Sequence, residues 1–215
     1  MSANLTVIED YVKVIYTHTE WQPAKITTSV LAARLGLAAS SVTEMVKKLV
    51  AQGLAIHEPY GAVELTAAGN ELALRMIRRH RLIETWLVDR YGYSWDEVHD
   101  EAEVLEHALS DRLLDAIDAE LGYPTRDPHG DLIPRVDGSI VRPTAAQLSD
   151  IDAGVVVRIS DRDPTVLRQL ETEGVVLDAH VRVVERDALG ATVSISEVAV
   201  RLTDEALASI WVKPE

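Results

Sequence analysis

The sequence contains no cysteine. This absence excludes disulfide frameworks, all-cysteine zinc sites, iron–sulfur clusters and thiol catalysis. No apolar run approaches the roughly 20 residues that a membrane-spanning helix needs. The first residues, Met1 to Asn4, also lack the basic and apolar regions of a secretion signal. We therefore expect a cytoplasmic protein with no membrane partner.

Positive charge is scarce and unevenly distributed. The 215 residues carry a net charge of −14, with 47% hydrophobic and 26% charged residues, a balance typical of folded domains. Residues 1–81 hold nine Lys and Arg against seven Asp and Glu, a net charge of +2, which leaves −16 for residues 82–215. A near-neutral first third and a strongly acidic remainder indicate that the two parts have different partners.

The first third has the element order of a winged helix-turn-helix. Apolar periodicity predicts a helix from Leu5 to Thr19, a second from the caps Thr27 and Thr28 to Gly36, and a third over 39–52. Two short β-type runs follow, Leu54–Glu58 and Ala62–Thr66, joined by a turn at Pro59–Gly61.

Small hydroxylated residues open the third predicted helix, where a recognition helix approaches base edges and phosphates. Such residues are also ordinary helix caps, but the hairpin and the local charge favour DNA contact. No Arg or Asn on the first turn offers a bidentate base contact, so base specificity is not readable. The candidate DNA-binding residues are Thr28, Ser29, Ser40, Ser41, Thr43, Lys47 and Lys48.

The middle of the chain concentrates metal-ligating residue types. Helices are predicted over Thr66–Arg90, Ser94–Leu109 and Asp111–Leu121. His80 and Glu84 lie one turn apart within the apolar stripe of the first of these, where a carboxylate is costly unless it is paired or bound to a cation. Further candidates on one face of the next helix and on the first helix are His99, Glu103, Glu106, His107 and Asp10.

Each of these residues also has a purely structural interpretation. His80 alone is typical of a core histidine, Glu106 alone of a solvated surface, and Asp10 alone is compatible with an ion pair to Arg75. Two His/Glu sets at helical spacing in a chain without cysteine favour a metal site.

The last third predicts a small β-barrel. A connection rich in Gly and Pro spans 122–142, and a single helix is expected over Pro164–Glu173. The strands are expected at Val155–Ile159, Val181–Glu185, Thr192–Ile195 and Val198–Leu202. We therefore predict a mainly α protein with small β parts: a winged helix-turn-helix domain over 1–72, a helical metal-binding and dimerisation domain over 73–141, a linker over 142–150 and an SH3-like β-barrel over 151–215.

Several stretches carry a resemblance to a known family. They are Glu9–Tyr11 with Ile15–Tyr16, Ser41–Leu49, Arg79–Glu84, Val98–Glu103 through Glu106–His107, and Pro128–Gly130 with Ile133–Pro134. The chain resembles the diphtheria-toxin-repressor family of metal-dependent transcription regulators, in its manganese-regulator branch. The resemblance implies a homodimer that binds double-stranded operator DNA when loaded with metal and represses metal-uptake genes. It also implies no enzymatic activity and no small-molecule substrate.

Carried over by position, the resemblance implies two metal sites. The primary site would use Asp10, Glu103, Glu106 and His107. A second site would use His80, Glu84 and His99, with Asp163 from the barrel. Some members instead use the Pro-His-Gly loop, where this chain has Asp127 and His129, although Asp127 is also typical of a loop cap.

The resemblance also bears on the metal. The iron-sensing branch has Met and Cys where this chain has Asp10 and Glu103. Carboxylates in place of sulfur favour the harder Mn²⁺ over Fe²⁺, although Fe²⁺ and other divalent ions bind the same ligand types.

Two alternative functions and the position of the dimer surface stay open. An Fe²⁺-dependent repressor of the same family would be separated by its activation profile, and a helical di-metal carboxylate enzyme by the lack of DNA binding. The dimer surface is expected on the stripe formed by Leu113, Leu114, Ile117 and Leu121, unless this stripe completes the intramolecular core.

Overall fold

The computed structural model describes residues 3–21, 24–58 and 61–214, and it divides the chain into two compact units. The first unit comprises residues 1–79 and 134–139, and the second comprises 80–133 and 140–215. The boundary falls within one continuous helix, α4 (Ala67–Tyr91), whose first half belongs to the first unit and whose second half belongs to the second.

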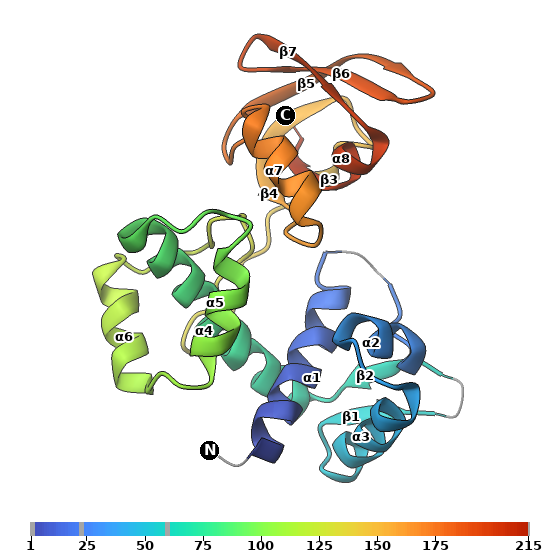
Figure 1. Cartoon of the computed structure of the whole chain (residues 1–215), viewed down its shortest axis with the longest axis vertical. Helices are drawn as coiled ribbons and strands as arrows, with labels where there is room; N and C mark the ends of the chain where they lie inside the picture. Colours follow the sequence, from blue (N-terminus) through green and yellow to red (C-terminus); the bar gives the residue numbers. More distant parts are fainter. Residues whose placement is uncertain (1–2, 22–23, 59–60, 215) are drawn as a thin grey trace. The chain divides into compact units, whose positions relative to one another are not determined.

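The first unit is a winged helix, as predicted (Figure 1). Its helices precede a two-stranded antiparallel hairpin in which Ala55 pairs with Leu65 and His57 with Val63. The turn residues Pro59 and Tyr60 lie outside the described residues. The elements are α1 (Ala3–Thr19), α2 (Thr28–Leu35), α3 (Ala39–Ala51), β1 (Ala55–His57) and β2 (Val63–Leu65).

Local chemistry accounts for the helix-turn-helix. The Thr27 hydroxyl accepts a hydrogen bond from the Val30 amide and caps α2, which ends at Gly36 with φ of 64°. A left-handed backbone favours glycine there, because it carries no Cβ. Helix α3 begins at Ala39, and its N-cap residue, Ala38, offers no side-chain hydrogen bond. Its apolar face is buried through Val42, Val46 and Leu49.

Within the described ranges no single helix is long and apolar enough to span a membrane. Helices α2 and α3 together meet the length and composition requirement, but they are bent by 113° at their junction.

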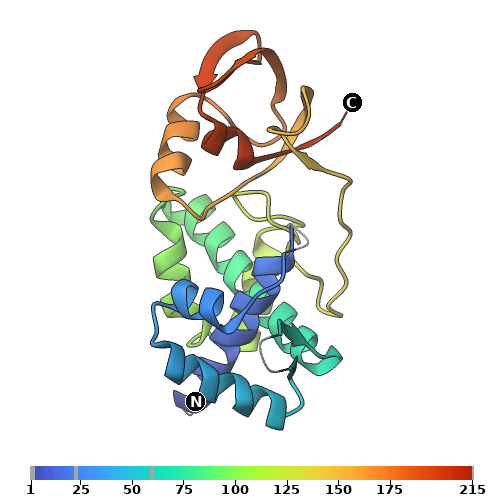
Figure 2. The same ribbon diagram turned by 90° about the vertical axis from the view of Figure 1, so that its right-hand side faces the viewer.

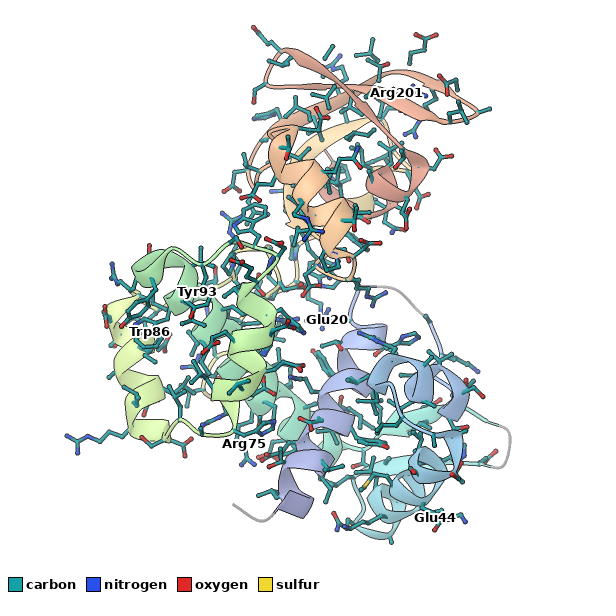
Figure 3. All side chains as sticks on the ribbon, viewed as in Figure 1. Glu20, Glu44, Arg75, Trp86, Tyr93 and Arg201 are labelled. Carbon is teal, nitrogen blue, oxygen red and sulfur yellow. The ribbon has the colours of Figure 1, made fainter. Side chains whose placement is uncertain are left out.

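The helical part of the second unit packs α4 against two shorter helices, α5 (Val98–Glu106) and α6 (Asp111–Glu120) (Figure 1). Its core contains Leu82 and Ile83 of α4 with Val98 of α5. Trp86 and Tyr93, which are labelled in Figure 3, pack against this core.

The helix predicted from Ser94 to Leu109 is shorter in the structure. Residues 95–97 form a turn, and the helix runs only over Val98–Glu106. The Trp95 carbonyl accepts a hydrogen bond from the imidazole of His129. This long-range contact uses the carbonyl that a helix starting at Ser94 would direct to the amide four residues later.

The C-terminal part of the second unit is a six-stranded antiparallel sheet in the order β3-β8-β4-β5-β6-β7. Helix α7 supplies Leu167 and Leu170 to the core of this sheet, and Figure 2 shows the helix (orange) to one side of the strands. The elements are β3 (Ala146–Gln147), β4 (Ala153–Ile159), α7 (Pro164–Thr172), β5 (His180–Asp187), β6 (Gly190–Ile195), β7 (Val198–Leu202), α8 (Asp204–Ala208) and β8 (Ile210–Lys213).

The four predicted strands and the predicted helix α7 are confirmed. The structure adds β3, α8 and β8, which the sequence reasoning missed although Ile210–Val212 is a short apolar run. The fold class, mainly α with a winged helix-turn-helix and an SH3-like C-terminal sheet, is confirmed.

Candidate metal centre

His80 and Glu84 of α4 meet His99 of α5 in a compact cluster. His80 Nε2 lies 2.9 Å from Glu84 Oε1 and 3.1 Å from His99 Nδ1, and His99 Nδ1 lies 3.3 Å from the same Glu84 oxygen. The helical spacing stacks His80 over Glu84, while the packing of α5 on α4 brings in His99. His80 and Glu84 are buried, and the His99 side chain is 44% exposed.

Glu84 is held as a carboxylate in this buried position. Burial opposes ionisation of Glu84. The charge of His80, together with hydrogen bonds from His80 and His99, nevertheless lowers the pKa of Glu84 well below its usual range. A buried carboxylate beside two imidazoles is a ligand set suited to a divalent cation.

Glu84 belongs to a second cluster with Asp127 and His129. One potential ligand atom from each of the three residues lies within 4.8 Å of the others, and all three residues are buried. Asp127 and His129 come from the loop after α6, so they reach α4 through tertiary packing rather than through helical spacing.

His129 is oriented as a metal ligand. Its Nε2 donates to the Trp95 carbonyl at 3.0 Å, which assigns the ring proton to Nε2. The other ring nitrogen, Nδ1, is buried and has no hydrogen-bond partner among the residues that the structure describes. Buried polar atoms are rarely left unpartnered, so a lone pair beside two carboxylates fits a bound cation.

Asp127 has two roles in its loop. Its Oδ1 accepts hydrogen bonds from the amides of His129 and Asp131, each at 2.9 Å. Burial and the nearby carboxylates of Asp131 and Glu84 raise the pKa of Asp127 to about 8, although His129 and Arg81 oppose the shift. The carboxyl therefore retains a proton at neutral pH in the absence of a cation.

The predicted ligand Asp163 is placed elsewhere. Asp163 is the N-cap of α7, and its Oδ1 accepts hydrogen bonds from the amides of Thr165 and Val166. Among the described residues of the second unit, the clusters whose ligand atoms converge do not include it. A different carboxylate, Asp161, lies 4.0 Å from His99 Nδ1. The sequence did not indicate Asp161, because the resemblance to the family assigns this ligand to Asp163, two residues later.

The predicted primary-site residues of α5 lie close to the same centre. His80 Nδ1 contacts Glu106 Oε2 at 2.5 Å, and the other Glu106 oxygen lies 3.4 Å from His107 Nε2. Glu103 Oε1 lies 3.6 Å from His99 Nε2. Asp10, the remaining predicted ligand, lies on α1 in the first unit.

The candidate DNA-binding residues lie on α2 and α3 of the first unit. Ser29, Ser40 and Ser41 are exposed. Thr43 donates to the Ala39 carbonyl at 2.8 Å, as a helix-internal hydroxyl does, and Lys47 lies 2.8 Å from Glu44 on the exposed face. Thr28 and Lys48 are half-buried.

The stripe expected at a dimer surface is largely internal. Leu114 and Ile117 are buried within the chain, whereas Leu113 is 46% exposed. Leu121 packs against the helical core. Most of this stripe thus completes the intramolecular core, which was the alternative interpretation.

Three protein-family models match successive parts of the chain. They are the N-terminal DNA-binding domain of iron-dependent repressors over residues 5–63, the metal-binding and dimerisation domain of iron-dependent repressors over 66–135, and the FeoA domain over 144–214. Together with the winged helix and the buried ligand set, these matches define a metal-dependent, DNA-binding transcriptional repressor. Operator DNA and a second copy of the chain are the partners that the matched domains indicate.

The iron-dependent repressor IdeR of Mycobacterium bovis is 30% identical over 210 residues, covering 91% of each chain. The regulator MntR of Oceanobacillus iheyensis is 33% identical over 116 residues, covering 54% of this chain and 78% of the relative. A solved structure described as a manganese-dependent transcriptional repressor in complex with manganese is 50% identical, with a TM-score of 0.92, and covers 97% of this chain and 100% of that one. The chain therefore belongs to the family of iron-dependent repressors, which includes the diphtheria toxin repressor. This is the family that the sequence motifs predicted.

Proposed function

We propose that the chain is a Mn²⁺-activated repressor that controls metal-uptake genes. The observation that carries this proposal is the buried oxygen and nitrogen ligand set around Glu84, in which His129 Nδ1 has no hydrogen-bond partner within the described part of the chain. The chain has no cysteine, so no thiolate ligand is available to favour a softer ion.

The ligand chemistry and the relatives support manganese over iron. Carboxylate and imidazole ligands suit Mn²⁺, whereas sulfur ligands would select softer ions. The 50% identical structure is described as a complex with manganese, while the mycobacterial relative is named for iron. An iron-activated repressor is therefore the second candidate.

Two sites per chain are proposed. The primary site follows the family resemblance and uses Asp10 with Glu103, Glu106 and His107. For the second site, we favour the ligand set Glu84, Asp127 and His129, because His129 Nδ1 has no hydrogen-bond partner among the described residues. His80 and His99 contact the Glu84 carboxylate from α4 and α5.

The residues of the second site explain why a cation would act as a switch. Without a cation, Glu84 and Asp127 place two carboxyls in one buried cluster, and Asp127 avoids the repulsion by keeping a proton. A bound divalent cation supplies positive charge that lets both carboxylates ionise. The cation activates DNA binding to the extent that it binds the DNA-competent arrangement more tightly, so operator DNA should in turn tighten Mn²⁺ binding.

A DNA-binding titration with promoter DNA of metal-uptake genes tests the proposal. We expect the full chain to bind with Mn²⁺ and to release the DNA when a chelator is added. The D10A variant should lose this metal response and keep its circular dichroism spectrum, while the control E101A, on the exposed side of α5, should respond like wild type. Equal binding with Mn²⁺ and with chelator would overturn the proposal. Activation by Fe²⁺ at lower free concentrations than Mn²⁺ would favour the iron-dependent alternative.

A further inference from the structure

The loop that supplies Asp127 and His129 is a closed turn. The Asp127 amide donates to the Asp131 carbonyl at 2.9 Å, and the Gly130 amide donates to the Asp127 carbonyl at 3.1 Å. The Asp127 side chain closes the turn from inside by accepting from two of its amides. Residues 127–131, called here the ligand loop, therefore form one hydrogen-bonded unit, in which the position of Asp131 is linked to that of both candidate ligands.

Strand β4 of the FeoA domain holds this loop through the backbone. The Ile159 amide donates to the His129 carbonyl at 2.8 Å. Gly130 has φ of 91°, and a Cβ added there would overlap the Val157 carbonyl oxygen. The loop backbone thus lies in direct contact with β4, at a distance that only glycine allows.

A β-bulge turns Arg158 of β4 towards the loop. The pairing of β4 with β8 shifts between Val156 and Arg158. Val156 and Ile159 both face the core of the FeoA domain, so the extra residue leaves Arg158 on the opposite side. There the Arg158 guanidinium lies over the Trp211 ring, 4.4 Å from its centroid. Its Nε donates to Asp131 Oδ1 at 2.7 Å.

We propose that Arg158 and Asp131 are positioning residues for the second metal site. Through this ion pair, the FeoA domain sets the geometry of Asp127 and His129 without donating a ligand of its own. The inference rests on the proposed site of Glu84, Asp127 and His129. It goes beyond that site by assigning to the FeoA domain the control of its geometry.

The surroundings of the pair favour positioning over simple stabilisation. Arg158 and Asp131 are both buried, and a buried ion pair is often no more stabilising than a well-packed apolar pair. Asp131 also has a second cation, because Arg81 approaches the same Oδ1 at 3.5 Å. Arg158 additionally fixes the orientation of the Asp131 carboxylate, because its own guanidinium is held between the Trp211 ring and that carboxylate.

Calorimetric Mn²⁺ titrations of the full metal-free chain, well below its melting temperature, test this inference. H129A, which removes a ligand, should abolish one class of site. R158M and D131N should weaken the same class of site by about 10- to 100-fold, as the loss of outer-shell partners does. Because the two residues act as one pair, R158M/D131N should weaken it no further than D131N alone. The matched control R182M, an exposed arginine on β5 of the same domain, should bind like wild type.

A melting curve of each metal-free variant separates positioning from stability. If the pair only stabilises the fold, its loss lowers the metal-free melting temperature and leaves the Mn²⁺ affinity of the folded chain unchanged, which would overturn the inference. If R158M fails to fold, D131N and the double variant decide, because D131N removes the loop carboxylate and the double variant removes both charges of the pair. Unchanged Mn²⁺ binding in H129A would overturn the proposed site itself. Loss in H129A with wild-type affinity in D131N and the double variant would overturn only the role of the pair.

Discussion

Replacing Asp127 by asparagine should stabilise the metal-free protein at alkaline pH while weakening its response to Mn²⁺. The pKa of Asp127 is about 8 in the folded chain, against an ordinary value of 3.8. Between these values the folded chain keeps a proton that the unfolded chain has lost. Unfolding is therefore increasingly favoured as the pH rises through this window. Asparagine removes this titration and retains an Oδ1 acceptor for the amides of His129 and Asp131.

The size of the effect follows from the two pKa values. Between pH 6 and pH 8 Asp127 is ionised in the unfolded chain but still largely protonated in the folded chain. This difference should lower the free energy of unfolding by about 2 to 3 kcal/mol. For a chain of this length, that corresponds to a fall in melting temperature of about 5 to 10 °C. His129 adds a slope of the same sign. Burial lowers its pKa, but the nearby acidic groups, among them the charged Glu84 and Asp161, raise it overall, so the folded chain holds this proton to higher pH than the unfolded chain does.

Differential scanning calorimetry in chelator, at fixed protein concentration and at several pH values, measures this slope. Wild type should lose stability between pH 6 and pH 8, and D127N should lose less by about 2 to 3 kcal/mol. The control D178N removes an exposed carboxyl whose hydrogen bonds with Arg126 lower its pKa, so its slope in this window should match wild type. Asparagine also tolerates the φ of 65° at this position. Added Mn²⁺ should raise the melting temperature of D127N less than that of wild type. Equal pH slopes for wild type and D127N would refute the account of a buried, protonated Asp127.

Two further substitutions separate the ligand loop from the neighbouring helix cap. D163A should lower stability by about 1 kcal/mol through loss of the α7 cap. It should leave the Mn²⁺ affinity measured by calorimetry unchanged, and a weakened affinity would return Asp163 to the ligand set. G130A forces a side chain into a left-handed backbone against Val157, so we expect a loss of at least about 1 to 3 kcal/mol in thermal unfolding. It should also weaken Mn²⁺ binding, and wild-type values of both quantities would show that the loop does not need its contact with β4.

Much of the fold was predictable because it depends on local pattern. The helices of the winged domain follow apolar periodicity, and their ends follow Thr27 and Gly36, whose side-chain and backbone preferences act within a few residues. The pairing of His80 with Glu84 was predictable for the same reason, since residues four apart in a helix stack on one face. The DNA-binding, metal-binding and FeoA segments are likewise identifiable from the sequence.

The sequence by itself therefore determined the order of elements, the class of protein and the residue types of the metal centre. Only the tertiary structure decided which of those residues meet. His129 obtains its orientation from Trp95, 34 positions earlier, and Asp131 meets Arg158 through a bulge in β4. The use of Asp163 as a helix cap, with Asp161 beside His99, depends on where α7 begins relative to α5. Contacts of this kind form between segments distant in sequence, and no local periodicity encodes them because their geometry is set by the packing of the whole unit.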